Sequence, residues 1–166
     1  MKSSKFLILL TTAFLLCLSS CEDDDCPECP ESVLFKGQYI TYPNILDDAD
    51  GVLTVDIPSE GTATDLGAST WSSASLVYAN TNPPWTQTGD MVFEETATGD
   101  QLIGSFTGTS LPNPPDNPFM GSGEYVITSG TGKYAGVTGE GTYSYEVSPE
   151  MIGELMFTGI LTYPVK

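Results

Sequence analysis

The side chains of this sequence that could do chemistry are carboxylates, tyrosines, hydroxyls and lysines. Its 166 residues include 22 acidic and 5 basic side chains and contain no histidine. All the basic residues are lysines, so arginine is absent as well. These absences exclude Ser-His-Asp and Cys-His nucleophilic catalysis, histidine-ligated zinc or iron, and guanidinium clamps on carboxylates or phosphates. We therefore predict no catalytic residue, no metal ion and no cofactor.

Carboxylates in predicted strands are the remaining candidates for acid–base chemistry. Glu94 and Glu95 are adjacent, and neighbouring residues of a strand point to opposite faces, so one of the two is expected to face inward. Glu124, Glu146 and Glu154 lie in other predicted strands. An inward-facing glutamate could have a raised pKa and act as an acid or base, whereas an outward-facing one only adds solubility. We retain Glu124 as a candidate ligand-binding residue.

Three further carboxylates, Asp47, Asp48 and Asp50, precede a glycine and could hold a hard cation such as calcium. An EF-hand register that starts at position 46 places Leu46 and Ile57 where acidic ligands are needed. That template fails, and a tight Asp-Gly turn between two strands is the preferred interpretation. Calcium-assisted adhesion is kept as a third hypothesis for the function.

Aromatic side chains could stack on a sugar or on another flat apolar ligand. Trp71 lies in a predicted strand, and Trp85 follows Asn82-Pro83-Pro84, which is typical of a rigid loop. A tryptophan beside prolines can equally pin a loop to the core, and both interpretations stay open. The predicted ligand-binding residues are thus Trp85, Trp71 and Glu124, for a small apolar or carbohydrate ligand.

The N terminus has the layout of a secretory signal peptide. Lys2 and Lys5 precede an apolar run over residues 6–18, which is too short to span a membrane comfortably as a mature helix. The sequence LSSC, residues 18–21, resembles the lipobox of bacterial lipoproteins. This resemblance implies cleavage before Cys21 and fatty acylation of Cys21, as with diacylglycerol and palmitate, which anchors the chain in a membrane. An ordinary signal peptide beside a cysteine is the alternative.

The four residues after the cysteine are Glu22, Asp23, Asp24 and Asp25. They resemble the acidic export signal of surface lipoproteins of the Bacteroidetes. The resemblance implies a lipid-anchored protein of the outer membrane, exposed at the cell surface. A solvated acidic spacer is the alternative.

Cleavage would leave a mature chain with a large negative charge. It keeps three lysines against 22 acidic residues, a net charge of about −19. Such a chain repels phosphate backbones, so we predict that nucleic acid is no partner. The acids and prolines of residues 22–31 predict an extended tether. The predicted domains are the signal peptide over 1–20, the acidic lipidated tether over 21–33 and the barrel domain over 34–166.

Cys26 and Cys29 form a C-x-x-C pair within this tether. A redox site needs a strand-to-helix setting and a zinc site needs further ligands, and neither is present. The preferred interpretation is a disulfide in a small loop, formed in an oxidising compartment.

The rest of the chain alternates apolar and polar residues with a period of two and is interrupted by Gly, Pro, Asn and Asp, which predicts an all-β fold. The predicted strands cover residues 34–42, 52–57, 69–79, 91–96, 101–109, 121–129, 139–147 and 153–163. Their number and spacing predict a single antiparallel β-barrel of about eight strands, with a β-sandwich as the alternative. In the strand over 139–147, Tyr143, Tyr145 and Val147 share one face.

The densest motif is SGTGKYAG over residues 129–136, followed by GEGT over 139–142. It resembles a stretch of uncharacterised secreted bacterial proteins, which in turn resemble the allene oxide cyclase and dirigent barrels. Residues 61–67 and 100–109 match the same group, although Asp65 stands where that group often has histidine. The resemblance implies a β-barrel and, as one possible activity, an isomerase or cyclase of an apolar small molecule.

Two hypotheses for the function follow. The first is a membrane-anchored surface lipoprotein with a binding or structural role and no catalysis. The alternative is an allene oxide cyclase-like isomerase that uses an interior glutamate or tyrosine with bound water. A deep apolar cavity with one carboxylate would favour the alternative, and a packed interior would favour the first.

Overall fold

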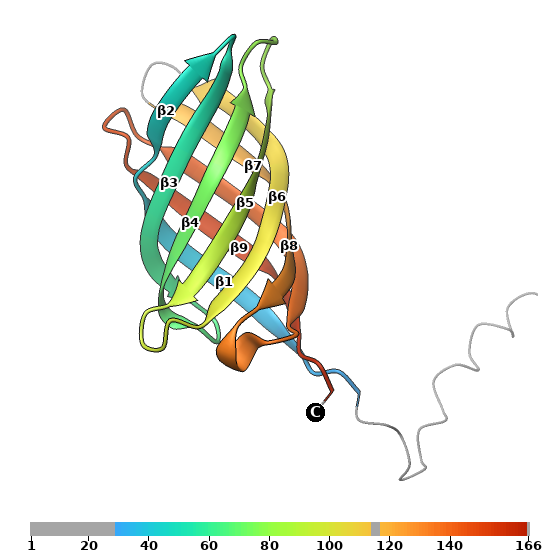
Figure 1. Ribbon diagram of the computed structural model, residues 1–166. Helices are drawn as coiled ribbons and strands as arrows, with labels where there is room; N and C mark the ends of the chain where they lie inside the picture. Colours follow the sequence, from blue (N-terminus) through green and yellow to red (C-terminus); the bar gives the residue numbers. More distant parts are fainter. Residues whose placement is uncertain (1–28, 114–116, 166) are drawn as a thin grey trace, which may run out of the picture. The chain divides into compact units, whose positions relative to one another are not determined.

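Strands make up almost all of the body of the molecule. The computed structural model describes residues 29–113 and 117–165, of which residues 30–165 form one compact unit. Its elements are β1 (Ser32–Thr41), β2 (Asn44–Ala49), β3 (Val52–Ala63), β4 (Gly67–Tyr78), β5 (Trp85–Glu95), β6 (Gln101–Asn113), β7 (Asn117–Gly130), the short 3₁₀ helix η1 (Gly132–Tyr134), β8 (Thr138–Val147) and β9 (Gly153–Thr162) (Figure 1). The predicted all-β fold is confirmed.

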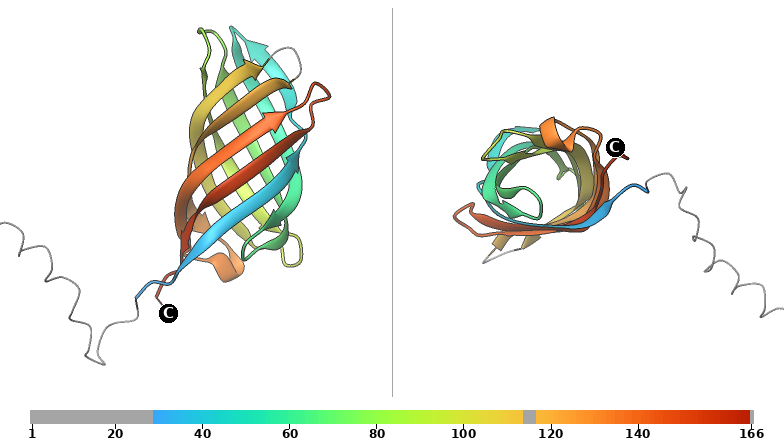
Figure 2. Two further views of the ribbon diagram at one scale, coloured as in Figure 1. Left: turned by 180° about the vertical axis from the view of Figure 1, so that it is seen from behind. Right: turned by 90° about the horizontal axis from the view of Figure 1, so that it is seen from below.

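Eight of these strands close into an antiparallel barrel. The hydrogen-bonded order is β1-β9-β8-β7-β6-β5-β4-β3, and β3 pairs back with β1 (Figure 2). The predicted eight-stranded barrel is confirmed, and the β-sandwich alternative is wrong. We call the end where β1 begins and β9 ends the lower end, as drawn in Figure 1, and the end formed by the β2–β3, β4–β5 and β8–β9 connections the upper end.

The remaining strand, β2, is not part of this closed ring. It follows β1 in the chain and continues its direction at the upper end. β1 pairs with residues 59–63 of β3, whereas β2 pairs with residues 52–56 of the same strand. Pro58 lies between these two stretches, where β3 needs no backbone donor, and its carbonyl accepts the N–H of Tyr42 at 3.0 Å. The barrel is therefore closed by β1 at its lower end and bordered by β2 at its upper end.

The alternation pattern did not predict β2, and the structure explains why. All of its residues are exposed, so no inward face is marked by apolar residues, and a bulge between Ile45 and Asp47 breaks the period of two. The predicted Asp-Gly turn is present: Ala49 pairs with Val52, and Asp50 and Gly51 have φ of 54° and 75°. Two successive residues with positive φ form the hairpin turn that matches the twist of the strands.

Inward-facing rings fill the lower half of the barrel. Phe93 and Phe157 meet edge to face at 4.9 Å between ring centroids, and Phe35 packs on Phe93 at 5.3 Å. Large inward rings lie directly opposite glycines of the neighbouring strands: Phe35 and Gly159, Tyr39 and Gly61, Phe157 and Gly37, Tyr125 and Gly141, Tyr143 and Gly123, Tyr145 and Gly121, and Phe106 and Gly89. An eight-stranded barrel has room for side chains and little else, so each ring uses the space that a Cβ would occupy.

The lower end is closed by the three glycine-containing stretches that carry the sequence resemblance. Asp65 from residues 61–67, Asp100 from residues 100–109 and Lys133 from η1 meet there. The Asp100 carboxylate accepts the backbone N–H of Lys133 at 3.1 Å, and the carbonyl of Asp65 accepts the hydroxyl of Tyr134 at 2.9 Å. The hydroxyl of Tyr163 donates to the Asp65 carboxylate at 3.1 Å. These residues tie connections together, and Asp65 serves as an acceptor in that closure.

Because inward rings occupy the space beside these glycines, we expect that adding one methyl group to such a glycine destabilises the folded protein. A Cβ on Gly141 would lie 2.6 Å from the Cα of Gly159 and 2.7 Å from the hydroxyl of Tyr125, and it would collide with the carbonyl of Thr158. We expect Gly141→Ala to lower the free energy of unfolding by about 1–3 kcal/mol, because backbone atoms cannot move aside. The measurement is urea denaturation, with the outward-facing neighbour Thr142→Ala as the control, for which a change within about 0.5 kcal/mol is expected. Equal losses in the two variants would contradict this account.

A candidate binding pocket in the upper barrel

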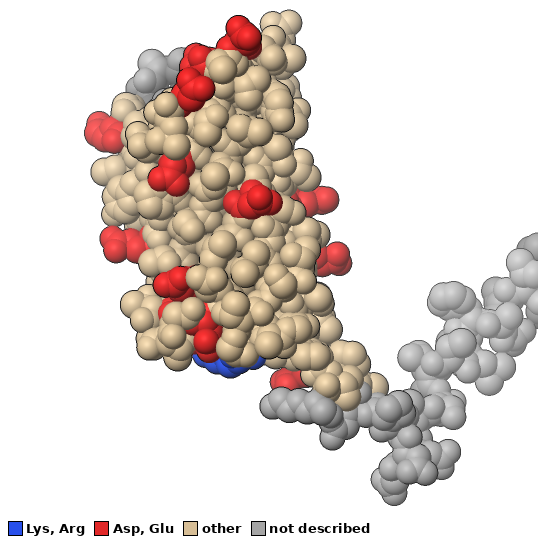
Figure 3. Space-filling view, in the orientation of Figure 1, with Lys and Arg blue, Asp and Glu red and all other residues tan. Residues whose placement is uncertain are grey.

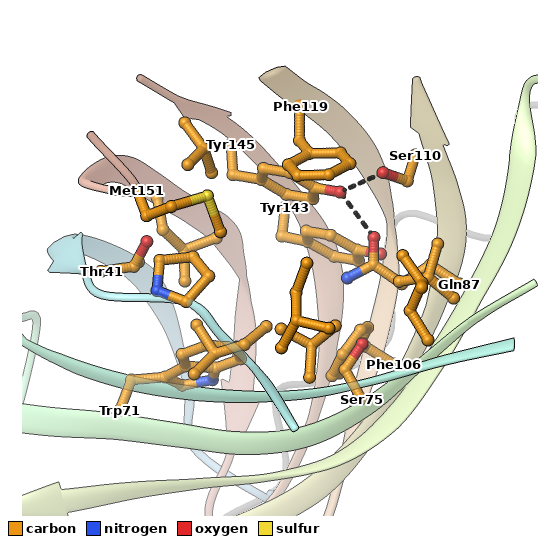
Figure 4. Close-up of a pocket in the computed structure, with 18 of the residues that line it drawn as sticks. Thr41, Trp71, Ser75, Gln87, Phe106, Ser110, Phe119, Tyr143, Tyr145 and Met151 are labelled. Carbon is orange, nitrogen blue, oxygen red and sulfur yellow. Dashed lines mark hydrogen bonds between the residues drawn. The ribbon is translucent and has the colours of Figure 1, made fainter. Parts of the chain in front are cut away.

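The upper half of the barrel interior contains a pocket of about 60 Å³ (Figure 4). This volume is several times the roughly 10–15 Å³ that one water molecule requires. Its lining is mainly apolar and comes from all nine strands: Thr41, Pro43, Ile45, Leu53, Val55, Ile57, Trp71, Ser75, Val77, Gln87, Phe106, Ser110, Phe119, Tyr143, Tyr145, Val147, Met151, Leu155 and Phe157. The barrel is thus filled below and partly open above.

The pocket has a buried floor and an accessible mouth. Trp71, Phe106 and Phe157 form the floor, where Trp71 contacts the other two rings at centroid distances of 6.2 and 5.6 Å. All three rings belong to the core cluster of the lower half. At the mouth, Ile45 of β2 is 44% exposed, and Met151 in the β8–β9 turn is half-buried. Exposure therefore rises from the floor towards the upper end, which is the side open to a ligand.

One wall of the pocket carries a closed polar network. The hydroxyl of Tyr145 on β8 is hydrogen-bonded to Oε1 of Gln87 at 2.7 Å and to Oγ of Ser110 at 2.9 Å (Figure 4). Gln87 and Ser110 are buried, so this network places fixed polar groups in an otherwise apolar space. Such a network orients neighbouring side chains and is costly to disrupt.

The ionisable groups of the lining are tyrosines that burial keeps neutral. Burial raises the pKa of Tyr145 to about 12, and the hydrogen bond between Tyr145 and Ser110 offsets part of this rise. Burial also raises the pKa of the Tyr143 hydroxyl well above its ordinary value. Among the described residues that line the pocket, none is Asp, Glu, Lys or Cys. The pocket is therefore uncharged at neutral pH.

The predicted ligand-binding residues lie in different places. Trp71 is buried and forms part of the pocket floor. Trp85 is the first residue of β5 and so lies in a strand, not in the expected loop; its indole N–H donates to the carbonyl of Thr81 at 3.0 Å, and it does not line the pocket. Glu124 is exposed on the outer face of β7. The structure thus brings one of these three residues to the pocket.

The other candidate carboxylates also lie outside the pocket. Glu94 accepts a hydrogen bond from the side chain of Gln101 at 2.7 Å. Glu95 forms an ion pair with Lys133 at 2.8 Å, and the hydrogen bond from Lys133 lowers the pKa of Glu95. Glu146 and Glu154 are exposed. Among the described residues, no glutamate therefore lines the apolar pocket in which an acid–base role would place it.

Other predicted sites can be placed only in part. In the described part of the chain, no group of three or more His, Cys, Asp or Glu residues could hold a metal ion, which includes Asp47, Asp48 and Asp50. Cys21, residues 22–25 and Cys26 lie outside the described residues. Cys29 is exposed, and its pairing with Cys26 stays a prediction. No helix in residues 29–113 and 117–165 has the length and apolar character to cross a membrane.

The sequence did not single out Gln87, Ser110 or Ser75 as site residues. Each lies at an inward position of its strand and is buried there. The sequence alone does not show which polar residues of a strand are buried, because serine and glutamine are also common at outward positions. Tyr145 was placed correctly on the same face as Tyr143 and Val147.

The raised pKa of Tyr145 predicts how stability depends on pH. A tyrosine whose pKa is higher in the folded than in the unfolded protein contributes its full stability below about pH 10 and loses it as the pH rises towards about 12. We expect the free energy of unfolding, measured by urea denaturation, to fall over this range. In Tyr145→Phe the fall should be smaller by up to roughly 3 kcal/mol, since one pKa unit corresponds to about 1.4 kcal/mol. The other buried tyrosines are present in both proteins, and the charge interaction of Tyr143 with Tyr145 is lost together with the Tyr145 hydroxyl, so identical pH profiles would contradict the assignment.

Comparisons with protein-family models, with curated proteins and with solved structures gave no match for this chain. The resemblance to the allene oxide cyclase and dirigent barrels therefore stays a prediction from the sequence. What the chain does is to be inferred from its fold, its pocket and its N-terminal motifs.

Proposed function

We propose that this chain is a lipid-anchored lipoprotein of the outer membrane, exposed at the cell surface, whose barrel binds a small apolar molecule without converting it. The observation that carries the binding role is the uncharged, largely apolar pocket that opens at the upper end of the barrel. A binding site of this kind gains affinity from burying apolar surface and orientation from a few fixed polar groups.

The position of the pocket in the barrel suits a tethered protein. Ser32 at the start of β1 pairs with Thr162 at the end of β9, so the chain enters the barrel at the lower end. The mouth, marked by Ile45 and Met151, is at the upper end. The start of β1 and the mouth of the pocket thus lie at opposite ends of the barrel.

The chemistry of the lining supports binding over catalysis. The alternative isomerase or cyclase would need a group that takes or gives a proton at neutral pH. Glu124 faces outward, and the titratable groups that line the pocket are the hydroxyls of Tyr143 and Tyr145, whose raised pKa values make ionisation unfavourable. The feature that favours the alternative is the fixed Tyr145 hydroxyl in its network with Gln87 and Ser110, which could orient a substrate.

The anchoring part of the proposal is tested by replacing the lipidated cysteine. We expect Cys21→Ser to move the protein from the membrane fraction to the soluble fraction, because the acyl chains can no longer be attached. Cys26→Ser, five residues further on, is the matched control and should stay with the membrane. Mass spectrometry of the mature N terminus should find the mass of the acyl groups on Cys21. A membrane-bound Cys21→Ser protein, or an unmodified Cys21 in the wild type, would refute the anchor.

The binding part is tested by closing the mouth of the pocket. Toluene is a neutral probe that suits a small apolar cavity, and its binding can be followed by ¹H–¹⁵N NMR shifts of the pocket residues. We expect Ile45→Trp to weaken toluene binding at least tenfold, because the larger side chain would fill the mouth. Leu46→Trp is the control, since Leu46 is the next residue of β2, is 61% exposed and does not line the pocket. Equal affinity in both variants, or no shift at pocket residues in the wild type, would refute a ligand site here.

A further inference from the structure

We infer that the ligand of this pocket is an uncharged molecule that presents an oxygen acceptor to the indole N–H of Trp71 and the hydroxyl of Ser75. This inference rests on the proposed binding function and adds the chemical class of the ligand. Three observations support it. Two buried donors that line the pocket have no hydrogen-bond partner, both lie on the same strand, and no charged side chain lines the pocket among the described residues.

The two donors are buried and have no partner among the described residues. Trp71 is 3% exposed and Ser75 is 0% exposed, and neither Nε1 of Trp71 nor Oγ of Ser75 makes a hydrogen bond within the protein. Buried polar groups are almost always hydrogen-bonded, because an unpaired one costs about 1–3 kcal/mol. Both residues line the pocket. A group bound in the pocket could supply the missing partner.

The wall of the pocket opposite Trp71 and Ser75 differs in its hydrogen bonding. β8 lies opposite β4 in the closed barrel, four strands away in either direction, and Figure 4 shows Trp71 and Ser75 across the pocket from Tyr145 and Ser110. The hydroxyl of Tyr145 is already hydrogen-bonded to two side chains. The unpartnered polar atoms of the lining are therefore concentrated on β4, with one exception.

That exception is the hydroxyl of Tyr143, which is turned towards the barrel wall. It lies 2.5 Å from the point that a Cβ on Gly108 would occupy, and the Cα of Gly123 is 2.7 Å from the same point. The hydroxyl thus rests on the backbone of β6 and β7. It is not a second anchor for a ligand in the centre of the pocket.

The donors define which kind of atom they can bind. An indole N–H donates and cannot accept, so its partner must be an acceptor. A serine hydroxyl can donate to the same atom, since a carbonyl or ether oxygen has two lone pairs. An oxygen acceptor between Trp71 and Ser75 would satisfy both groups.

The charge of the lining excludes ions as ligands. A buried carboxylate needs a positive partner, and the described lysines are elsewhere: Lys36 is exposed on β1, and Lys133 is at the lower end with Glu95. A buried ammonium group would need a carboxylate, and none lines the pocket. Figure 3 shows acidic side chains spread over the visible face, with basic ones at its lower edge, which further disfavours anions. The many hydroxyls of a sugar would also lack partners, so ketones, esters, ethers and alcohols fit best.

The test compares two probes of the same shape. Cyclohexanone and methylenecyclohexane differ in one group, a C=O in place of a C=CH₂. We expect the wild-type protein to bind cyclohexanone roughly fivefold more tightly for each hydrogen bond gained, as a neutral hydrogen bond contributes about 1 kcal/mol. The indole ¹H–¹⁵N signal of Trp71 should move downfield with cyclohexanone. The indole signal of Trp85, which already donates to Thr81, is an internal control.

Two small substitutions on one strand provide the matched variants. Ser75→Ala should reduce the preference for cyclohexanone by roughly the same fivefold. Ser73→Ala is the control: Ser73 is 4% exposed and has no partner for its hydroxyl, but it does not line the pocket. The preference should be unchanged in that variant. Neither substitution adds volume to the core, so both are expected to fold.

The outcomes separate this inference from the proposed function. Equal affinity for both probes, tighter binding of methylenecyclohexane, or a preference that survives Ser75→Ala with an unmoved Trp71 signal would overturn the inference and leave an apolar binding site in place. Binding of neither probe, together with no binding of toluene, would overturn the proposed function and the inference with it.

Discussion

The narrowness of an eight-stranded barrel is the constraint on which the rest of this structure depends. A ring that points inward can be housed only where the neighbouring strand has no side chain, and the pairs Phe35 with Gly159 and Tyr125 with Gly141 show how this is met. In the lower half the rings from several strands pack edge to face on one another. In the upper half, β4 presents the small residue Ser75 inward, and Ser75 lines the pocket.

The same constraint explains the glycine-rich motif of the sequence. The glycines of this motif lie in β7 and β8 or at turns of the lower end. Gly132 has φ of 53°, and a Cβ there would collide with the carboxylate of Asp100. The spacing of these glycines therefore reflects closure of the barrel. The pocket lies at the other end of the barrel, away from this motif.

Much of this fold was predictable from the sequence because a half-buried strand records its two faces as alternation. The strands around Tyr143 and Phe157 were predicted within one or two residues. β3 and β5 are longer than predicted, since Pro58, Gly61 and Gly89 interrupt the pattern while the backbone pairing continues. β2 was missed because a strand exposed on both faces leaves no alternation to detect. Pairing of β1 with β3, which closes the barrel, joins segments whose contact no local pattern encodes.

The pocket was less predictable than the fold. Ser75, Gln87, Ser110 and Tyr145 are far apart in the sequence and meet only because the sheet closes on itself. Sequence reasoning favoured conspicuous residues such as Trp85 and Glu124, and the structure places both outside the pocket. Trp71 was found because a large aromatic residue in a strand is informative under either interpretation, as part of the core or as a contact for a ligand.

The position of β2 separates the opening of the pocket from the stability of the barrel. Within the described residues β2 has a hydrogen-bonded neighbour on one side alone, β3, while closure of the cylinder depends on β1. Releasing β2 would widen the mouth beside Ile45 without breaking a single hydrogen bond between β1 and β3. Local opening of this kind costs far less than global unfolding. A displacement of β2 would therefore change the mouth of the pocket while the pairing of β1 with β3, which closes the barrel, stays intact.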